Sequence, residues 1–362
     1  MKEKSKRVSK SPTLSQIAES AGVSKATASM ALNNNPLIAK ETRRRVLKIA
    51  QEKNYRPNFF ARRLSSGQTE SITLFCIVDD RESSGWVLPS TWNYYNPILK
   101  SAYFTLMEDN YQLQFEIVTY EEAVNKRIIL NKTLDSSTDG LLLLITSKND
   151  YSFLAELSDF PLVTLNATVS SSFCSVKVND QLGTYEAVNY LLSLGHQDIA
   201  HIKGPTDHFN VASRHEGYLK ALQKAGINPS PNYIKEGDWR IDSGERLMSE
   251  LLELETPPSA VFCCNDHMAI GALRAIKNKG LRVPEDISII GYDDSEIAKV
   301  AIPELTSIQP PLEELGRTGA NEILRLIKGK NIQTHHVVIS PKLIKRNSCG
   351  PAPGNDKTAI LV

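Results

Sequence analysis

Five side chains that could bind a small hydroxyl-rich ligand stand at the ends of predicted strands or near the starts of predicted helices. The carboxylate of Asp293, which follows a strand ending in IGY, can accept two hydrogen bonds from vicinal hydroxyls. Arg214 can donate to a ring oxygen or an anion, and Trp239 offers a flat apolar face suited to a sugar ring. Asn166 closes the segment PLVTLN, and Asn265 closes VFCCN.

Each of these residues also has a structural interpretation. Asn265 and Asp266 can cap the helix that follows them. Trp239 can belong to a core, and Arg214 can form an ion pair with Glu216. Residue types alone do not decide between these roles and ligand contacts.

No constellation of residues for catalysis stands out. The chain has no G-x-G-x-x-G, P-loop or nucleophile-elbow pattern at a strand-to-helix turn. His196 lacks a partner Ser or Cys, which favours a structural histidine. The neighbouring carboxylates of Asp79-Asp80 and of Asp293-Asp294 are expected to diverge, so neither pair shares a proton. We therefore expect no enzyme activity, no catalytic residue and no cofactor.

A second group of residues has the types and spacing of a DNA reader, in the segment TLSQIAESAGVSKATASMALNN over 13–34. Thr13 followed by Gln16 forms a capping box, so a helix begins directly after it. Gly22 supplies the left-handed backbone that ends this helix, and Ser24 caps a second one. Two short helices joined by a tight turn are the helix-turn-helix arrangement, whose second helix lies in the DNA major groove.

The predicted recognition helix has a thin apolar stripe, and small or polar side chains cover its remaining surface: Ala28, Ala31 and Leu32 in the stripe, and Lys25, Ala26, Thr27, Ser29, Met30 and Asn33 outside it. Lys25 can bond guanine acceptors, Ala26 can meet a thymine methyl group, and Met30 supplies only apolar contact. The alternative is a helical hairpin inside an ordinary bundle.

Charge is distributed unevenly along the chain. Residues 1–66 carry 15 Lys and Arg against 4 Asp and Glu, a charge of +11, whereas the whole chain is +1 and the remainder is therefore −10. A basic segment ahead of an acidic body concentrates phosphate affinity at one end, which favours DNA binding over the hairpin alternative. Residues 1–12 are expected to form a basic arm.

Length and composition limit the class of protein. The 362 residues suit two or three domains, and 41% hydrophobic with 23% charged residues is typical of soluble globular proteins. No apolar run reaches the ~20 residues of a membrane span, and the charged start MKEKSKRVSK is no signal peptide, which predicts a cytoplasmic protein. The cysteines lack metal-ligand spacing, so we expect reduced thiols and no metal site: Cys76, Cys174, Cys263, Cys264 and Cys349.

Two further basic helices follow the reader. The first, over 40–53, lacks a side-chain cap at Ala39. Its apolar positions are expected to pack and its cations to stay in solvent: Val46, Leu47, Ile49 and Ala50 against Arg43, Arg44, Arg45 and Lys48. The second, Asn58–Leu64, is too short to hold alone in water. Its Arg62 and its exposed Leu64 make sense if DNA completes the helix, with Leu64 wedged between base pairs in the minor groove.

From Ser71 onward, predicted strands alternate with predicted helices: strands 71–78, 112–118, 140–146, 161–165, 199–202, 233–236, 260–263 and 287–291, and helices 97–110, 181–194, 213–225, 242–254 and 266–279. This alternation predicts an α/β fold of two doubly wound parallel-sheet subdomains. Ligands of such sheets bind beyond the carboxyl ends of the strands, here where the two subdomains face each other.

The N-terminal segments resemble the LacI/GalR (lactose-repressor) family of transcription regulators. The matching residues are T-L-x-x-I-A-x-x-A-G-V-S-x-x-T-A-S from Thr13 to Ser29, Asn33, N-Y-x-P-N over 54–58, and A-R-R-L ending at Leu64. In the body, R-x-x-G-Y at Arg214, N-D-x-M-A-x-G-A at Asn265 and G-Y-D-D around Asp293 look like the family's effector-binding motifs. The likeness continues to about residue 347.

The resemblance implies a helix-turn-helix head and a hinge helix ahead of a periplasmic-binding-protein-like body. The implied domains are an arm 1–12, a DNA-binding domain 13–57, a hinge and linker 58–69, an effector-binding and dimerisation domain 70–347 (subdomains 70–178 with 310–338, and 179–308 with 339–347) and a tail 348–362. The implied DNA contacts are Thr13, Leu14, Ser24, Lys25, Ala26, Thr27, Ser29, Met30, Asn33, Asn58, Arg62 and Leu64. The implied effector contacts are Tyr95, Asn96, Asn166, Arg214, Trp239, Asn265 and Asp293. The loop 79–95 is longer than the family's usual pattern and carries Trp86 and Trp92, which suggests a larger or distinctive ligand.

The sequence therefore predicts a homodimeric, ligand-responsive transcriptional regulator that binds a near-palindromic double-stranded DNA operator. We expect this regulator to be a repressor. By the resemblance, an effector such as a sugar or sugar derivative binds between the subdomains and orders or melts the hinge. Two alternatives stay open: a regulator controlled by a purine or a phosphorylated protein, and a solute-binding protein. The second would need an export signal and no basic head.

Overall fold

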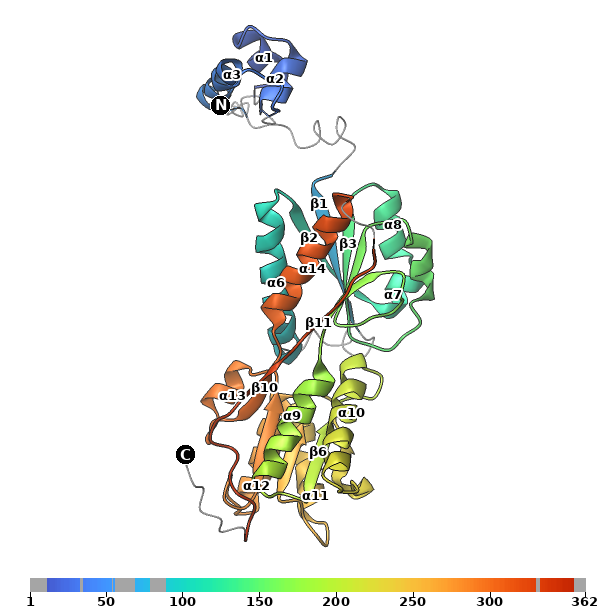
Figure 1. Ribbon diagram of the computed structural model, residues 1–362, viewed down its shortest axis with the longest axis vertical. Helices are drawn as coiled ribbons and strands as arrows, with labels where there is room; N and C mark the ends of the chain where they lie inside the picture. Colours follow the sequence, from blue (N-terminus) through green and yellow to red (C-terminus); the bar gives the residue numbers. More distant parts are fainter. Residues whose placement is uncertain are drawn as a thin grey trace, which may run out of the picture. The chain divides into compact units, whose positions relative to one another are not determined.

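The computed structural model of the protein describes residues 12–32, 35–53, 55, 69–78, 89–329 and 333–354. It divides into two compact units, Met1–Thr69 and Glu70–Val362 (Figure 1). The predicted arm up to residue 11, the reader residue Asn33, the hinge residues Asn58, Arg62 and Leu64, and the loop 79–88 lie outside the described residues.

The first unit contains three helices, α1 (Leu14–Ser20), α2 (Lys25–Leu32) and α3 (Lys40–Glu52). The capping box forms as predicted: the Thr13 N–H donates to Gln16 Oε1 at 2.8 Å, and the Gln16 N–H donates to Thr13 Oγ1 at 3.4 Å. Gly22 has φ +62°, the left-handed conformation that ends α1. The core is small and rich in alanine: Ile17, Ala18, Ala21, Ala28, Ala31, Val46 and Ala50.

Two expectations for α3 are wrong. Leu47 is 46% exposed, because it points away from the stripe made by Val46 and Ala50. The Arg43 guanidinium does not stay free in solvent, because its Nη2 donates to the carbonyl of Asn35 at 2.6 Å. Arg43 therefore ties α3 to the loop after α2. Ala39 provides no side-chain cap, as predicted.

The second unit contains two six-stranded sheets, which confirms the predicted fold class. Sheet 1 is parallel throughout and has the order β11-β5-β4-β3-β1-β2: β1 (Ser71–Val78), β2 (Gln112–Thr119), β3 (Gly140–Ile145), β4 (Leu162–Leu165), β5 (Cys174–Val178) and β11 (His336–Ile339). Sheet 2 has the order β12-β10-β9-β8-β6-β7: β6 (Ile199–Lys203), β7 (Ile234–Glu236), β8 (Ala260–Cys263), β9 (Ser288–Tyr292), β10 (Thr306–Gln309) and β12 (Lys342–Ile344). Only β12 is antiparallel to its neighbour within the described strands.

Helices cover both faces of each sheet, as parallel strands require. On sheet 1, α6 (Pro89–Glu108) packs beside α14 (Leu312–Ile327), while α7 (Tyr120–Asn125), α8 (Ile128–Leu134) and the 3₁₀ helix η1 (Ser152–Leu157) belong to a separate cluster. On sheet 2, α9 (Asp180–Ser193) pairs with α10 (Phe209–Lys224), and α11 (Ile241–Leu252) pairs with α12 (Asp266–Asn278); α13 (Glu296–Val300) and the 3₁₀ helix η2 (Pro231–Tyr233) are short.

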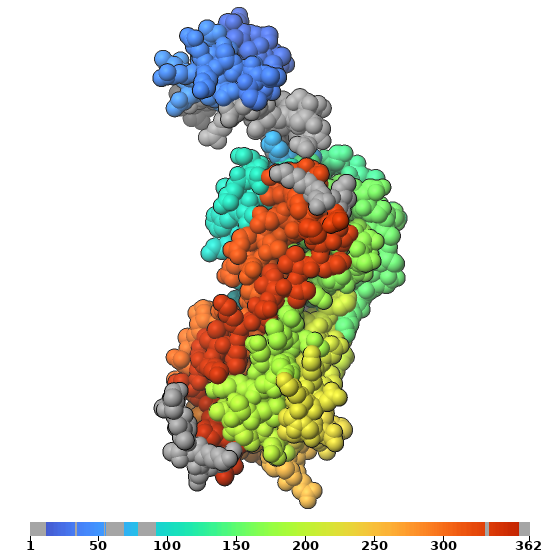
Figure 2. Space-filling model, viewed as in Figure 1, coloured from blue at the N-terminus to red at the C-terminus, as the bar shows by residue number. Residues whose placement is uncertain are grey.

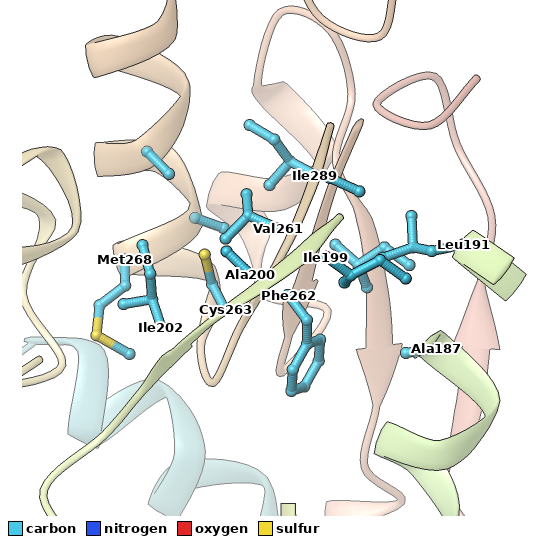
Figure 3. Packing of buried hydrophobic residues seen from close by; sticks show 14 of the residues in the cluster. Ala187, Leu191, Ile199, Ala200, Ile202, Val261, Phe262, Cys263, Met268 and Ile289 are labelled. Atoms are coloured by element: carbon cyan, nitrogen blue, oxygen red, sulfur yellow. The ribbon is translucent and has the colours of Figure 1, made fainter. Parts of the chain in front are cut away.

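The core of sheet 2 shows why alternate strand residues face different helices. Ile199 lies beside Leu191 of α9, whereas Cys263 points to the side of Met268 of α12 (Figure 3). The two faces of a strand alternate with a period of two residues, so a continuous apolar run is buried on both sides.

The chain crosses between the sheets three times, after Val178, Gln309 and Ile339. In the space-filling view, the orange-to-red chain that includes α14, β11 and β12 lies along one face of both subdomains (Figure 2). The strands and helices predicted from 71 to 291 are present with small shifts of their ends. One start is wrong: α6 begins at Pro89, so Pro97 lies inside the helix, and Ile98 and Ala102 after it are buried in the core.

Within the described residues, no helix is both long and apolar enough to cross a membrane. The described residues include all five cysteines, which form no disulfide bond, and four of them are buried.

Candidate functional site

Helix α2 is buried along a narrow edge of small side chains and leaves its polar side chains accessible. Ala28 and Ala31 are 0% and 1% exposed and form its inner edge, whereas Lys25 and Ala26 are exposed. Ser24 caps the helix, because its Oγ accepts from the Thr27 N–H at 3.0 Å. The other predicted contacts in this unit are accessible to differing extents: Thr13 and Ser24 are exposed, and Leu14, Thr27, Ser29 and Met30 are half-buried. A helix with this free front can enter a major groove.

In the second unit, Arg214 is held at the carboxyl end of sheet 2 by three neighbours. Its Nε donates to Asp180 Oδ1 at 2.9 Å, and its Nη1 donates to the Cys264 carbonyl at 2.5 Å. The guanidinium carbon lies 3.5 Å from the centre of the Tyr292 ring. Burial opposes the charged form, but Asp180 and the other nearby acidic groups raise the pKa of Arg214 above its ordinary value. The proposed Arg214–Glu216 ion pair does not form; Glu216 instead accepts from Gln181.

Asp293 and Asp294 diverge, as predicted for neighbours in a strand-end loop. Asp294 is buried and pairs with Arg346, and it also accepts from Gln309 Nε2 at 2.8 Å. The Asp293 side chain makes no hydrogen bond within the described chain. Its burial raises its pKa well above the usual range, and Arg214 offsets only part of this effect. Its φ of +108° is strained for a non-glycine residue, as is common in binding sites.

The subdomain of sheet 1 contributes Tyr94 of α6 and Asn166, which follows β4, to the same place. The Tyr94 hydroxyl donates to Asn166 Oδ1 at 2.7 Å, and the Asn166 amide donates to the Ile145 carbonyl at 3.3 Å. Burial raises the pKa of Tyr94, and the charge of Asp180 raises it further. We call these residues from both subdomains the inter-subdomain site: Tyr94, Asn166, Asp180, Arg214, Tyr292 and Asp293. A cavity of about 320 Å³ adjoins it, lined in part by Asn166 and Asp180.

Of the two predicted effector residues on α6, one lies in the core and the other is exposed. Tyr95 is 1% exposed and belongs to the core of sheet 1, so the residue before it supplies the hydroxyl. Asn96 is exposed on α6. Trp92, also on α6, is 41% exposed and packs near the Phe115 ring of β2. A helix turns by 100° per residue, so an error of one position in the sequence exchanges a core side chain for a site side chain.

Trp239 and Asn265 form a second cluster on sheet 2. Trp239 is half-buried, packs edge-on to His208 and lies directly against Gly204, where an added Cβ would approach its ring to 2.3 Å. Asn265 caps α12 by accepting from the Met268 N–H at 2.9 Å, and its amide donates to the Trp239 carbonyl at 2.9 Å. The capping interpretation of Asn265 is thus correct, and the cap also fixes the Trp239 backbone.

Besides the three crossovers, main-chain hydrogen bonds between two loops join the subdomains. Loop 146–148 and loop 207–209 are linked by an antiparallel bridge and two hydrogen bonds: Ser147–His208, Lys148 N–H to Asp207 O (2.5 Å) and Phe209 N–H to Thr146 O (2.9 Å). The Phe209 side chain packs on the cluster that contains α7 and α8.

Three members of the inter-subdomain site were not predicted from the sequence: Tyr94, Asp180 and Tyr292. Tyr94 and Tyr292 each precede a residue that was selected, and Asp180 opens α9 directly after a crossover. Only the three-dimensional arrangement brings Asp180 to Arg214, 34 positions away.

The structure supports a structural role for His196, which is 1% exposed. Its ring nitrogens lie 2.9 Å from Ser259 Oγ and 3.0 Å from Ser288 Oγ, and burial lowers its pKa. In the described chain, no group of His, Cys, Asp and Glu side chains could hold a metal ion.

The first unit contains a helix-turn-helix whose second helix leaves polar side chains accessible. The second unit contains two parallel-sheet subdomains that enclose buried polar groups. This combination defines a DNA-binding transcription regulator. Comparison with known families agrees. Residues 13–58 match the family described as "Bacterial regulatory proteins, lacI family", and residues 188–349 match "Periplasmic binding protein-like domain".

Relatives of known name share almost the full length of the chain. A protein of Bacillus subtilis (strain 168) named "Probable HTH-type transcriptional repressor ExuR" is 34% identical over 93% of this chain and 98% of its own. The repressor PurR of Pasteurella multocida (strain Pm70) is 32% identical over the same shares. The chain therefore belongs to the LacI family of bacterial regulatory proteins, as the resemblance implied.

Two solved structures place this likeness in three dimensions. The lac repressor dimer bound to operator and the anti-inducer ONPF has a TM-score of 0.79 at 28% identity, covering 94% of this chain and all of the other. A CelR–cellobiose complex has a TM-score of 0.67 at 28% identity, covering 93% and 99%.

Proposed function

We propose that the protein is a homodimeric transcriptional repressor whose affinity for a near-palindromic operator is set by a small hydroxyl-rich effector at the inter-subdomain site. The observation that carries this proposal is the unbonded carboxylate of Asp293 beside the fixed guanidinium of Arg214. Side-chain acceptors and donors arranged in this way suit vicinal hydroxyls. Two similar proteins are named repressors, and another is solved with cellobiose.

Control of DNA binding follows from differential affinity. An effector that contacts groups from both sheets, such as Tyr94 and Asp293, favours one relative arrangement of the subdomains. The expected consequence is a change in the order of the segment 58–69. This change would in turn alter the DNA contact that we propose for Leu64. Because its target is DNA, we place the protein in the cytoplasm.

Exposed apolar side chains support the dimer. On α6, Tyr103, Phe104 and Met107 are 43%, 54% and 50% exposed. At the end of α13, Val300 is 73% exposed, and Ile302 just beyond it is 90% exposed. Apolar groups of this size are covered at stable interfaces, and a second copy of this chain is the partner that a palindromic site requires.

The proposal is tested by selecting duplex DNA from a random pool with the purified chain, then measuring the melting temperature with a panel of sugars, sugar derivatives and purines. We expect an enriched palindromic sequence and a rise in melting temperature with at least one sugar. Enrichment of a palindrome with stabilisation by purines alone would favour the co-repressor alternative. Failure to enrich any sequence would refute the proposal that the protein is a sequence-specific regulator.

A further inference from the structure

The crossovers and one contact between loops hold the two subdomains together at different strands. We call this contact the clasp; it joins loop 146–148, which follows β3, to loop 207–209, which follows β6 and leads into α10. In sheet 1, β4 separates β3 from the crossover strand β5, and in sheet 2, β8 and β9 separate β6 from the crossover strand β10. Asn166 follows β4 and Asp293 follows β9, so the inter-subdomain site lies between the crossovers and the clasp in strand order.

The clasp is a buried main-chain contact. The donors of its two hydrogen bonds are the N–H groups of Phe209, at 2.9 Å from the acceptor, and of Lys148, at 2.5 Å. Ser147 and His208, which form the bridge between these bonds, are 2% and 5% exposed. Hydrogen bonds in such a place compete little with water, so they favour the joined arrangement of the subdomains. All of these groups belong to the chain, so the clasp needs no ligand to form.

Phe209 adds a side-chain anchor to the clasp. It is the first residue of α10, in the sheet 2 subdomain, but its half-buried ring packs on the hydrophobic cluster of the other subdomain, which contains Phe75, Ile129 and Leu154. One ring and two hydrogen bonds are few contacts beside the core of either sheet. Local opening takes place in regions of low contact density, so the clasp can open while both sheets stay folded.

The clasp also contacts the cluster formed by Trp239 and Asn265. The His208 ring packs edge-on to Trp239 with 5.5 Å between the ring centres, and the Trp239 carbonyl accepts from the Asn265 amide at 2.9 Å. A displacement of loop 207–209 therefore moves a direct neighbour of the Trp239 ring. Opening of the clasp and the position of this predicted effector contact are linked.

We infer that the clasp is a latch: it holds the subdomains closed at a distance from the crossovers, with Phe209 as its anchor, and it opens when the subdomains separate. Closure of two subdomains about a ligand needs a hinge, here at the crossovers, and contacts that form as the subdomains meet. Entry of an effector into the inter-subdomain site then requires release of Phe209, a consequence that rests on the proposed function. The latch itself depends on neither DNA nor effector.

The test measures amide hydrogen exchange at single residues, relative to intrinsic rates, in the full chain without DNA or sugar. In the wild type, the Lys148 amide should exchange at least about tenfold more slowly than the amide of its exposed neighbour Asn149. Phe209→Ala should speed exchange at Lys148 by about tenfold or more, although the changed side chain belongs to the other subdomain. Phe209→Leu keeps part of the apolar contact and should give a smaller increase.

The matched control is Phe160→Ala, which removes a half-buried ring from the same cluster within the sheet 1 subdomain. It should leave exchange at Lys148 within about twofold of the wild type. Three outcomes would overturn the inference: equal exchange at Lys148 and Asn149 in the wild type, no change at Lys148 in Phe209→Ala, or an equal increase in Phe160→Ala. If Phe209→Ala does not fold, Phe209→Leu decides by the same criterion.

The outcome is independent of the proposed function, because neither DNA nor effector is present. A chain that selects no operator but shows the expected exchange pattern refutes the proposed function and keeps the latch. A chain that selects an operator but lacks the pattern keeps the proposed function and refutes the latch.

Discussion

Helix α2 and the inter-subdomain site use functional side chains in opposite ways. On α2, Lys25 and Ala26 are exposed and carry none of the core. In the inter-subdomain site, Asp180 and Arg214 are buried and satisfy each other. Recognition and stability therefore depend on different side chains in the first unit but on the same side chains in the second unit.

The largest expected effect comes from breaking the buried ion pair. Arg214→Ala should lower the free energy of unfolding of the second unit by about 3–5 kcal/mol, because Asp180 is left as an unpaired buried charge. Urea denaturation measures this loss. The matched control is Glu216→Ala two positions away, an exposed residue for which we expect a change within about 0.5 kcal/mol. Equal, small losses in both variants would remove the contrast between the two regions.

The next effect tests whether Trp239 is fixed by its surroundings. Gly204→Ala should cost about 1–3 kcal/mol, because the new methyl group would lie 2.3 Å from the Trp239 ring and must displace it. We also expect a weaker response to effector. Gly226→Ala, at an open position with φ +74°, separates backbone strain from this clash, since it should cost stability without altering the response. An unchanged effector response in Gly204→Ala would argue against Trp239 as a ligand contact.

Asp293 should show the reverse sign, because its carboxylate is half-buried and makes no hydrogen bond within the described chain. Its folded-state pKa is raised above the unfolded value, so the wild type loses stability as pH rises from the unfolded pKa through the folded one. Asp293→Asn should therefore match the wild type near pH 4 and exceed it by about 1 kcal/mol at neutral pH. It should also abolish the effector response while operator binding persists. A stability difference that does not depend on pH would contradict the assignment.

The smallest effect on stability is expected on α2. Lys25→Ala should change the free energy of unfolding by less than about 0.5 kcal/mol, because the side chain is exposed and makes no core contact. The same change should relax base preference by about 1–3 kcal/mol at one position of each half-site. Selection from random duplexes with both proteins checks this, and identical binding profiles would rule out base reading by Lys25.

The helices of the first unit could be predicted from the sequence because the residues that begin and end them are close together in the chain. The Thr13–Gln16 capping box, the turn at Gly22 and the cap at Ser24 each depend on residues within three or four positions. Local reasoning failed at Leu47, where two neighbouring apolar residues cannot both face the same side of a helix.

The residues of the inter-subdomain site could be predicted only in part, because their contacts join segments that are distant in the sequence. Strand-end position identified Asn166 and Asp293, and motif likeness supported Arg214. The choice of Tyr95 over Tyr94 and the omission of Asp180 have a common cause: neither the rotation of α6 nor the partner of Arg214 is encoded within a few residues. Sequence patterns locate such a site but do not assign its hydrogen bonds.

The most direct test of the account measures operator affinity as a function of effector. The duplex selected from a random pool is titrated with the wild-type chain, with and without a sugar that raises its melting temperature, beside a scrambled duplex. We expect the selected duplex to bind at least about 1,000-fold more tightly than the scrambled one, and the sugar to change this affinity by about 5–150-fold. Equal affinity for the two duplexes, or an operator affinity that the bound sugar leaves unchanged, would contradict this expectation.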